Sequence, residues 1–496
     1  MKRIRVLSTL LLMLLVFAND IMAQNPQGVN VVFIGNSITY GACLSDRENS
    51  APPAVVKREL EQKGVGEVNV SNLGRSGSTT VDWLPSTGTL FNKVVDVADK
   101  YAQDNRPLIF SVSLGTNDSA IEGPNGSPLT AEMYGKNLYT IVDTLMKRYP
   151  KSSVIVNYPI WYSSNTYNSA RYLVEGQKRL FGYNAEIADL VWKKSRAKDR
   201  GRIYEGNKAV WELFKNHEEW YVRENGQAGV FLLHPNERGA SELGKILAES
   251  IYDVWRHESP EVVTLKSGSQ ILIYKPVSGK AKKGIVVCPG GGYTFLATDH
   301  EGTRLAHWFS KNDIAAVVLL YRMPKGDCKV PLTDAAEAIE YMRKNSDELG
   351  GYEQVGIMGS SAGGHLASTA ATHLTGKKGV DFHILLYPVI TMELGVTHKG
   401  SHDNLLGNNP TAEMERQYSN ELRVTEETSR AFVFLASDDK TVPAENSMRY
   451  VNALLKCKVP CTLHMYPTGG HGWGWSDGYF YKKQWTSELL RWLEQF

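Results

Sequence analysis

The sequence has few cysteines and no long run of charge of one sign. Five cysteines among 496 residues are too few for a fold built on disulfide bonds. Lys and Arg number 55 against 53 Asp and Glu, a formal net charge of +2, and this near balance argues against a nucleic-acid partner. Internal repeats and low-complexity segments are also missing from the sequence, which excludes repeat and fibrous architectures.

The state of the five cysteines is open. Cys457 and Cys461 stand close enough in sequence to pair in an oxidising compartment. All five are equally compatible with free buried thiols, since free cysteine is among the most buried residue types. None has a histidine partner in a local signature, which disfavours a cysteine nucleophile. The five are Cys43, Cys288, Cys328, Cys457 and Cys461.

The most marked apolar stretch is N-terminal, and it is short. Three basic residues precede the apolar residues 6–17, and Ala23 offers a small residue at the expected cleavage point. This order predicts a signal peptide over residues 1–23. Because the stretch is too short to span a bilayer comfortably, an uncleaved anchor is the weaker alternative. We therefore expect a bacterial protein that is periplasmic or secreted, with no membrane contact beyond export.

The rest of the chain alternates apolar runs with amphipathic stretches, a pattern that predicts parallel sheets covered by helices. At this length, two or three domains are expected. A polar segment ending in proline, residues 257–260, interrupts the alternation, which then restarts. We expect two α/β domains after the signal peptide, over residues 24–257 and 258–496. Candidate strands of the first domain are residues 31–34, 68–70, 108–114 and 153–158.

The second half contains the pattern Gly-x-Ser-x-Gly, at Gly359-Ser360-Ser361-Ala362-Gly363. A strand-like run precedes it and a helix-like stretch follows, as expected for a serine held on a tight strand-to-helix turn. Because the backbone is strained and closely packed at such a turn, glycine is needed on both sides. Ser361 is therefore a candidate nucleophile.

A serine hydroxyl needs a base, and that base needs an acid to orient it. Downstream, the pair Asp438-Asp439 and then His471 each follow a predicted strand, in the chain order expected for acid and base. The glycine-rich segment 288–293 follows another predicted strand, and bare glycine N–H groups suit an oxyanion hole. Its candidate donors are the N–H groups of Gly291, Gly292 and Ala362.

Residues 260–496 resemble the α/β-hydrolases of the bacterial acetyl-xylan esterase and esterase/lipase group. The likeness rests on Pro289-Gly290-Gly291-Gly292-Tyr293, on residues 359–365 and on Gly470-His471-Gly472. It implies Asp439 as the acid, because the family acid lies three residues before a Val-Pro pair. Its neighbour Asp438 is left to cap the next helix. Many relatives have histidine where this chain has Pro289, which leaves the triad unaffected.

The first half carries a second serine motif, in a different local architecture. Four short blocks resemble those of the SGNH, or GDSL-like, hydrolases, which include carbohydrate O-deacetylases. The resemblance covers residues 29–256 and implies a flavodoxin-like three-layer α/β/α fold. The blocks are Gly35-Asn36-Ser37-Ile38-Thr39, Asn72-Leu73-Gly74-Arg75-Ser76-Gly77-Ser78-Thr79, Ser113-Leu114-Gly115-Thr116-Asn117-Asp118 and His234-Pro235-Asn236.

This resemblance makes Ser37 the nucleophile and His234 the base. The backbone N–H groups of Ser37 and Gly77 and the side chain of Asn117 would form the oxyanion hole. One position departs from the family pattern, because Phe231 stands where the family has an aspartate three residues before the histidine. Either a backbone carbonyl orients His234, or a distant acid does, or the domain has become a glycan-binding module. Candidate distant acids are Glu218, Glu219 and Glu237.

These features predict an exported serine carboxylic ester hydrolase of two domains, which removes acetyl groups from a plant polysaccharide, with acetylated xylan as the first candidate. The expected partner is that acetylated polysaccharide or an oligosaccharide. No cofactor is expected, and no metal, since His300, His398 and His402 lack metal-ligand spacing and the sequence has no His-Glu-x-x-His motif. Fold does not fix substrate, so a feruloyl esterase, a lipase-like enzyme or a peptidase remains open for the second domain. A sialate O-acetylesterase is a further alternative.

Overall fold

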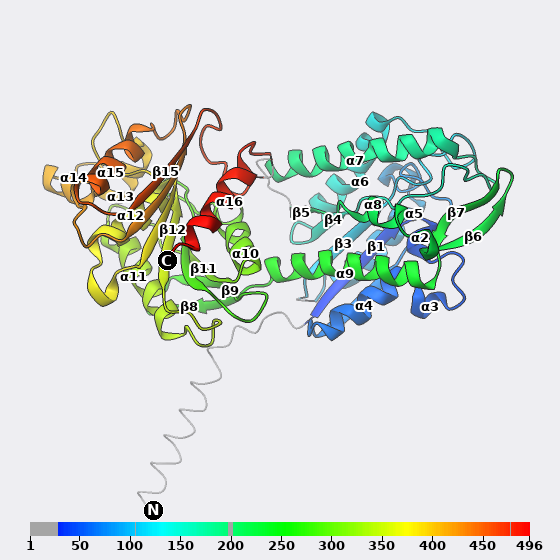
Figure 1. Cartoon of the computed structure of the whole chain (residues 1–496), viewed down its shortest axis with the longest axis horizontal. Helices are drawn as coiled ribbons and strands as arrows, with labels where there is room; N and C mark the ends of the chain where they lie inside the picture. The colour runs from blue at the N-terminus through cyan, green and yellow to red at the C-terminus, as the bar shows by residue number, and fades with distance from the viewer. Residues whose placement is uncertain (1–27, 105, 197–201, 477) are drawn as a thin grey trace, which may run out of the picture. The chain divides into compact units, whose positions relative to one another are not determined.

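The computed structural model describes residues 28–104, 106–196, 202–476 and 478–496 (Figure 1). The chain divides into two compact units, Pro26–Ser259 and Pro260–Phe496. The predicted signal peptide, residues 1–23, lies outside the described residues. Among the residues that are described, no helix is both long enough and apolar enough to cross a membrane.

The N-terminal unit is built on a five-stranded parallel sheet with the strand order β2-β1-β3-β4-β5. This is the order of flavodoxin-like sheets. Its strands are β1 (Gly28–Gly35), β2 (Glu67–Asn72), β3 (Leu108–Ser113), β4 (Ser153–Val156) and β5 (Ile203–Glu205). Every residue of β1 is buried, as expected for a central parallel strand that is covered on both faces.

Helices cover this sheet, and a separate two-stranded hairpin follows it in the chain. The hairpin pairs β6 (Tyr221–Gly226) with β7 (Gly229–Pro235) in antiparallel fashion. The helix α6 shows why these segments are helical: the Thr130 side chain accepts a hydrogen bond from the Met133 N–H at its start, and two basic residues occupy its last turn. The helices of the unit are α2 (Ser37–Tyr40), α3 (Arg47–Ser50), α4 (Pro52–Gln62), α5 (Thr89–Tyr101), α6 (Ala131–Arg148), α7 (Leu173–Arg196), α8 (Val210–Lys215) and α9 (Glu237–Glu258).

The C-terminal unit contains an eight-stranded sheet with the order β15-β14-β13-β12-β10-β11-β9-β8. β8 and β9 run antiparallel to their neighbours, and the other pairs are parallel. The strands are β8 (Glu261–Thr264), β9 (Gln270–Tyr274), β10 (Lys283–Cys288), β11 (Ile314–Leu320), β12 (Val355–Ser360), β13 (Phe382–Leu386), β14 (Arg430–Ala436) and β15 (Cys461–Tyr466). The two units confirm the predicted α/β class.

Two buried apolar clusters lie on the faces of this sheet. Along β10, Ile285 and Val287 belong to one cluster, whereas Val286 and Cys288 belong to the other, because successive side chains of a strand point to opposite faces. The helices that contribute to these clusters are α10 (Arg304–Lys311), α11 (Lys329–Lys344), α12 (Ala362–His373), α13 (Lys399–Leu406), α14 (Ala412–Tyr418), α15 (Glu445–Lys456) and α16 (Lys482–Leu493).

Two sequence expectations differ from the structure, and one alternative that the sequence left open is decided. The helix α9 runs on to Glu258, so half of the expected linker at residues 257–260 is helical. Cys457 and Cys461 are free thiols and do not pair. Cys43 is exposed rather than buried.

Candidate active sites

In the C-terminal unit, Ser361 stands on a strained turn between β12 and α12. Its φ is 53° and its ψ is −119°, a conformation that non-glycine residues adopt only when the surrounding structure enforces it. Neighbouring glycines make the turn possible, because a Cβ on Gly359 would lie 2.0 Å from the Gly363 carbonyl oxygen. The serine hydroxyl is thereby presented at the carboxyl end of the sheet.

The predicted base and acid meet this serine. His471 Nε2 lies 2.8 Å from Ser361 Oγ, and His471 Nδ1 lies 2.6 Å from Asp439 Oδ2. The second carboxylate oxygen of Asp439 accepts hydrogen bonds from the backbone N–H groups of Thr441 and Val442, at 2.8 and 3.0 Å. With both oxygens engaged and only 1% of its side chain exposed, the carboxylate is held in one orientation toward the imidazole.

The neighbouring Asp438 does not cap the next helix, contrary to the expectation from the sequence. Its carboxylate accepts hydrogen bonds from the backbone N–H groups of Gly469 and Gly470, at 3.3 and 2.8 Å. These glycines directly precede His471 in the chain. Asp438 therefore stabilises the loop that carries the base, while Asp439 orients the base itself.

The glycine-rich segment predicted to form the oxyanion hole is held by a buried glutamate that sequence reasoning missed. Gly291 and Gly292 have φ values of +131° and +63°, which glycine adopts at little cost. Glu301, only 3% exposed, accepts a hydrogen bond from the Gly290 N–H at 2.9 Å. Its other oxygen accepts one from the Tyr387 hydroxyl at 2.8 Å. The Tyr387 ring in turn packs edge-on against His471, with ring centroids 4.8 Å apart, so Glu301 is linked to both the oxyanion segment and the base.

In the N-terminal unit, Ser37 begins the short helix α2 directly after β1. The Asn36 side chain caps this turn by accepting a hydrogen bond from the Ile38 N–H at 3.0 Å. Gly35 is required at the strand end, because a Cβ there would lie 2.0 Å from the Thr39 hydroxyl. Ser37 Oγ lies 3.0 Å from His234 Nε2, so the predicted nucleophile and base are in hydrogen-bonding contact.

The acid that orients His234 is Glu224, on the adjacent strand β6. Glu224 Oε1 and Oε2 lie 2.9 and 3.0 Å from His234 Nδ1, and Oε1 also accepts the backbone N–H of His234 at 3.2 Å. Phe231, at the position expected for the acid, is buried in the core and pairs with Glu224 across the hairpin. The strand next to the histidine thus supplies the carboxylate that the histidine's own strand lacks.

The three distant acids proposed from the sequence do not contact His234, which corrects that expectation. Glu219 pairs with His217, Glu237 accepts hydrogen bonds from Ser45, and within the described part of the chain the contacts of His234 are with Ser37 and Glu224 rather than with Glu218. The sequence carried a signal for the hairpin but not for its register. Asn-Gly at residues 225–226 favours a hairpin, but these two residues end β6 and the turn lies at residues 227–228. The marker therefore does not by itself place Glu224 beside His234.

The predicted oxyanion donors of this unit line one cleft together with the nucleophile and base. Ser37, Gly77, Asn117 and His234 all border a cavity of about 860 Å³. The Asn117 amide is held from both ends, because its oxygen accepts a hydrogen bond from Tyr172 at 2.7 Å and its nitrogen donates one to the Ser78 carbonyl at 2.8 Å. An amide nitrogen carries two hydrogens, so the second remains for an oxyanion in the cleft.

Each of the two units matches a known family of hydrolases. Residues 33–241 match the GDSL-like Lipase/Acylhydrolase family, and residues 285–474 match the alpha/beta hydrolase fold. The chain joins a GDSL-like domain to an α/β-hydrolase domain. This confirms the two resemblances stated from the sequence, and the predicted class of serine ester hydrolase agrees with both families.

Several relatives share parts of the chain. An acetylxylan esterase of Xylanibacter ruminicola is 36% identical over 233 residues, covering 46% of this chain and 48% of that protein. Endo-1,4-beta-xylanase B of Butyrivibrio fibrisolvens is 35% identical over 226 residues, covering 40% of this chain and 35% of that protein. This chain therefore spans about half or less of these two relatives. The structure of an acetyl ester-xyloside bifunctional hydrolase from Caldicellulosiruptor lactoaceticus is 36% identical, covering 46% of this chain and 88% of that one, with a TM-score of 0.44.

The base of the GDSL-like domain predicts an alkaline activity profile. Burial lowers the pKa of the His234 imidazole, but the hydrogen bonds and charges of Cys43 and Glu224 outweigh it and raise the pKa from 6.5 to about 9. A general base must be neutral, so activity should rise with pH through about pH 9. The measurement is kcat/KM against pH for a Ser361→Ala variant, so that only the GDSL-like domain contributes. A chelator is present throughout. An inflection at or below pH 6.5 would contradict the prediction.

Proposed function

We propose that this protein is an exported serine esterase with two active domains, which removes O-acetyl groups from a plant polysaccharide. Acetylated xylan is the first candidate substrate. The observation that carries the proposal is the presence of two complete serine–histidine–carboxylate arrangements in one chain. The similarity to an acetylxylan esterase over 46% of the chain supports acetyl as the group that is removed and xylan as the polymer that carries it. Export is supported by the N-terminal residues 1–23, whose charge and apolar pattern fit a signal peptide.

The reaction in the GDSL-like domain follows from its geometry. Ser37 Oγ attacks the ester carbonyl and its proton passes to His234 Nε2, 3.0 Å away. The Glu224 carboxylate keeps the Nδ1 proton in place and stabilises the imidazolium that forms. The developing oxyanion is stabilised by donors that line the same cleft. The sugar hydroxyl leaves with the proton from His234, and water, activated by the same imidazole, releases acetate from the acetyl-serine.

The α/β-hydrolase domain performs the same two steps with its own groups. Ser361 attacks, His471 carries the proton, and Asp439 holds the imidazole through the 2.6 Å contact at Nδ1. Two dissimilar active sites on one chain would allow acetyl groups at different sugar positions to be removed from one polymer. Joining them also raises the local concentration of the second domain at a polymer bound by the first.

The test uses the whole chain and compares its activity on two classes of ester. Purified protein is incubated with acetylated xylan and with feruloylated arabinoxylan, and released acetate and ferulate are quantified. We expect acetate release that is abolished in the Ser37→Ala/Ser361→Ala double variant. Preferential release of ferulate would replace the proposal with a feruloyl esterase. Acetate release that survives in the double variant would show that both site assignments are wrong.

A further inference from the structure

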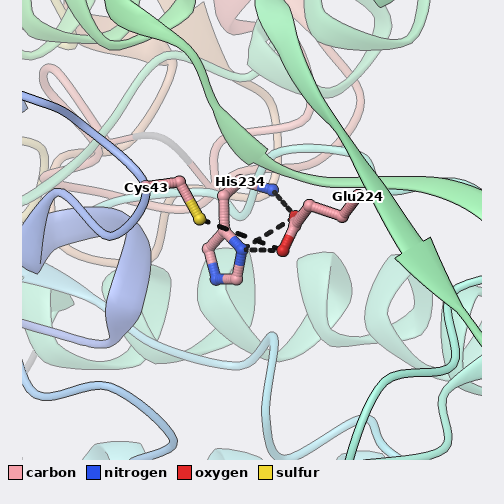
Figure 2. Close-up of side chains that lie close together, drawn as sticks. All are labelled: Cys43, Glu224 and His234. Atoms are coloured by element: carbon pink, nitrogen blue, oxygen red, sulfur yellow. Dashed lines mark hydrogen bonds and ion pairs between the residues drawn. The ribbon is translucent and has the colours of Figure 1, made fainter.

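A thiol, a carboxylate and an imidazole from three chain segments meet beside the nucleophile of the GDSL-like domain (Figure 2). Cys43 lies in the turn after α2, Glu224 on β6 and His234 on β7. One potential ligand atom from each side chain lies within 4.8 Å of the other two. Cys43 Sγ is 3.9 Å from Glu224 Oε2. Serine–histidine–carboxylate catalysis has no use for a thiol at this position.

We propose that Cys43, Glu224 and His234 bind a thiophilic divalent cation, Zn²⁺ in particular, and that the bound ion switches the GDSL-like domain off. Thiolate sulfur, imidazole nitrogen and carboxylate oxygen are the three ligand types that zinc takes in proteins. A fourth position would remain for water. The ion binding is independent of the proposed esterase function, whereas the inhibition rests on it.

The geometry suits a tetrahedral ion with small adjustments. With Zn–S near 2.3 Å and Zn–N and Zn–O near 2.0 Å, adjacent ligands lie about 3.5 Å apart for S···O and about 3.3 Å for N···O. With Glu224 Oε2 as the ligand oxygen, the observed separations are 3.9 Å to Cys43 Sγ and 3.0 Å to His234 Nδ1. These two separations therefore need to change by about 0.4 Å and about 0.3 Å. Cys43 is exposed, which gives a cation a route to the cluster.

The turn that carries Cys43 is tied to the nucleophile. The backbone N–H groups of Gly41 and Ala42 both donate to the Ser37 carbonyl, at 3.0 and 2.9 Å. Cys43 follows with a φ of +68°, a conformation uncommon outside glycine. On the other side, Glu224 and His234 are held by the β6–β7 hairpin. The ligands are thus positioned by backbone structure rather than by flexible side chains alone.

Inhibition follows from the protonation of His234. In the neutral working form, Nδ1 carries the proton toward Glu224 and Nε2 accepts the proton of Ser37. A metal ion at Nδ1 takes the lone pair at that nitrogen, so the neutral ring must carry its proton at Nε2 instead. Binding thus releases the thiol proton to water and moves the imidazole proton from Nδ1 to Nε2. A ring protonated at Nε2 cannot accept the Ser37 proton, and the first step of catalysis stops.

The binding half of the proposal is tested with Co²⁺, which replaces Zn²⁺ in sites of this kind. Co²⁺ is added to chelator-treated Ser37→Ala/Ser361→Ala protein, and the near-ultraviolet cobalt–thiolate absorption is recorded. We expect this absorption to appear, to vanish on addition of Zn²⁺, and to be missing in proteins that also carry Cys43→Ser or Cys43→Ala. The matched control is Cys457→Ser, a partly buried thiol of the other domain, which should leave the absorption unchanged. Absorption that persists without Cys43, or never appears, overturns the proposal.

The inhibitory half is tested by activity in the Ser361→Ala background, where only the GDSL-like domain hydrolyses an aryl acetate. We expect Zn²⁺ to inhibit, and Cys43→Ser to raise the half-inhibitory concentration by about 100-fold, since even outer partners of metal ligands contribute 10–100-fold to affinity. Equal inhibition with and without Cys43 overturns the proposal. If the domain shows no esterase activity, the proposed function fails for it, whereas the Co²⁺ spectrum still decides whether the ion binds.

Discussion

Replacing Ser361 with alanine is expected to lower kcat of the α/β-hydrolase domain by about 10⁶-fold, the scale seen when the nucleophile of a serine hydrolase is removed. Without the hydroxyl at 2.8 Å from His471 Nε2, no acyl-enzyme can form. The GDSL-like domain should keep its own activity, because its nucleophile, base and acid all lie in a separate compact unit. The measurement is hydrolysis of an aryl acetate and acetate release from acetylated xylan.

The counterpart variant supplies the control. Ser37→Ala should spare the α/β-hydrolase domain, and the rates of the two single variants should add up to the rate of the parent chain. The double variant should retain only background hydrolysis. If Ser361→Ala alone abolishes all release, the GDSL-like domain is not an esterase for these substrates. If Ser37→Ala alone does so, the same conclusion holds for the α/β-hydrolase domain.

Replacing Glu224 with glutamine is expected to lower kcat of the GDSL-like domain by about 10⁴-fold, as the equivalent aspartate-to-asparagine change does in a serine protease. A carboxamide N–H facing His234 Nδ1 favours the wrong imidazole tautomer, with the proton at Nε2. It also removes the negative charge that stabilises the imidazolium. The variant is made in the Ser361→Ala background, so that the remaining aryl-acetate hydrolysis reports on this domain alone.

The matched control is Glu219→Gln. Glu219 was a candidate acid from the sequence, but its carboxylate contacts His217 and its side chain is 54% exposed. Its replacement should leave kcat unchanged. An unchanged kcat for Glu224→Gln would show that a backbone carbonyl orients His234 instead. The site would then be the serine–histidine dyad considered from the sequence. A large loss at Glu219 would contradict the assignment of Glu224 as the acid.

Most of the α/β-hydrolase site could be predicted from the chain because its signals are local. The serine turn needs glycines within two residues, and the acid, the base and the oxyanion glycines each follow a strand that is visible as an apolar run. Parallel strands bring their carboxyl ends to one edge of a sheet, so order along the chain implies proximity in space. Glu301 escaped prediction because it acts from inside a helical segment, through hydrogen bonds to Gly290 and Tyr387 that no local pattern encodes.

In the GDSL-like site too, some residues are marked by local sequence, whereas others are placed only by the tertiary structure. Ser37, His234, Gly77 and Asn117 belong to short blocks whose backbone conformations depend on neighbouring residues, and the resemblance of these blocks to those of the SGNH family singled them out. What orients His234 was decided by strand pairing, because a cross-strand neighbour is set by the register of a hairpin rather than by distance along the chain. Folding therefore placed Glu224 opposite Phe231 and next to the base. Tertiary packing likewise brought Cys43, in the turn after α2, to Glu224 across 181 positions of sequence.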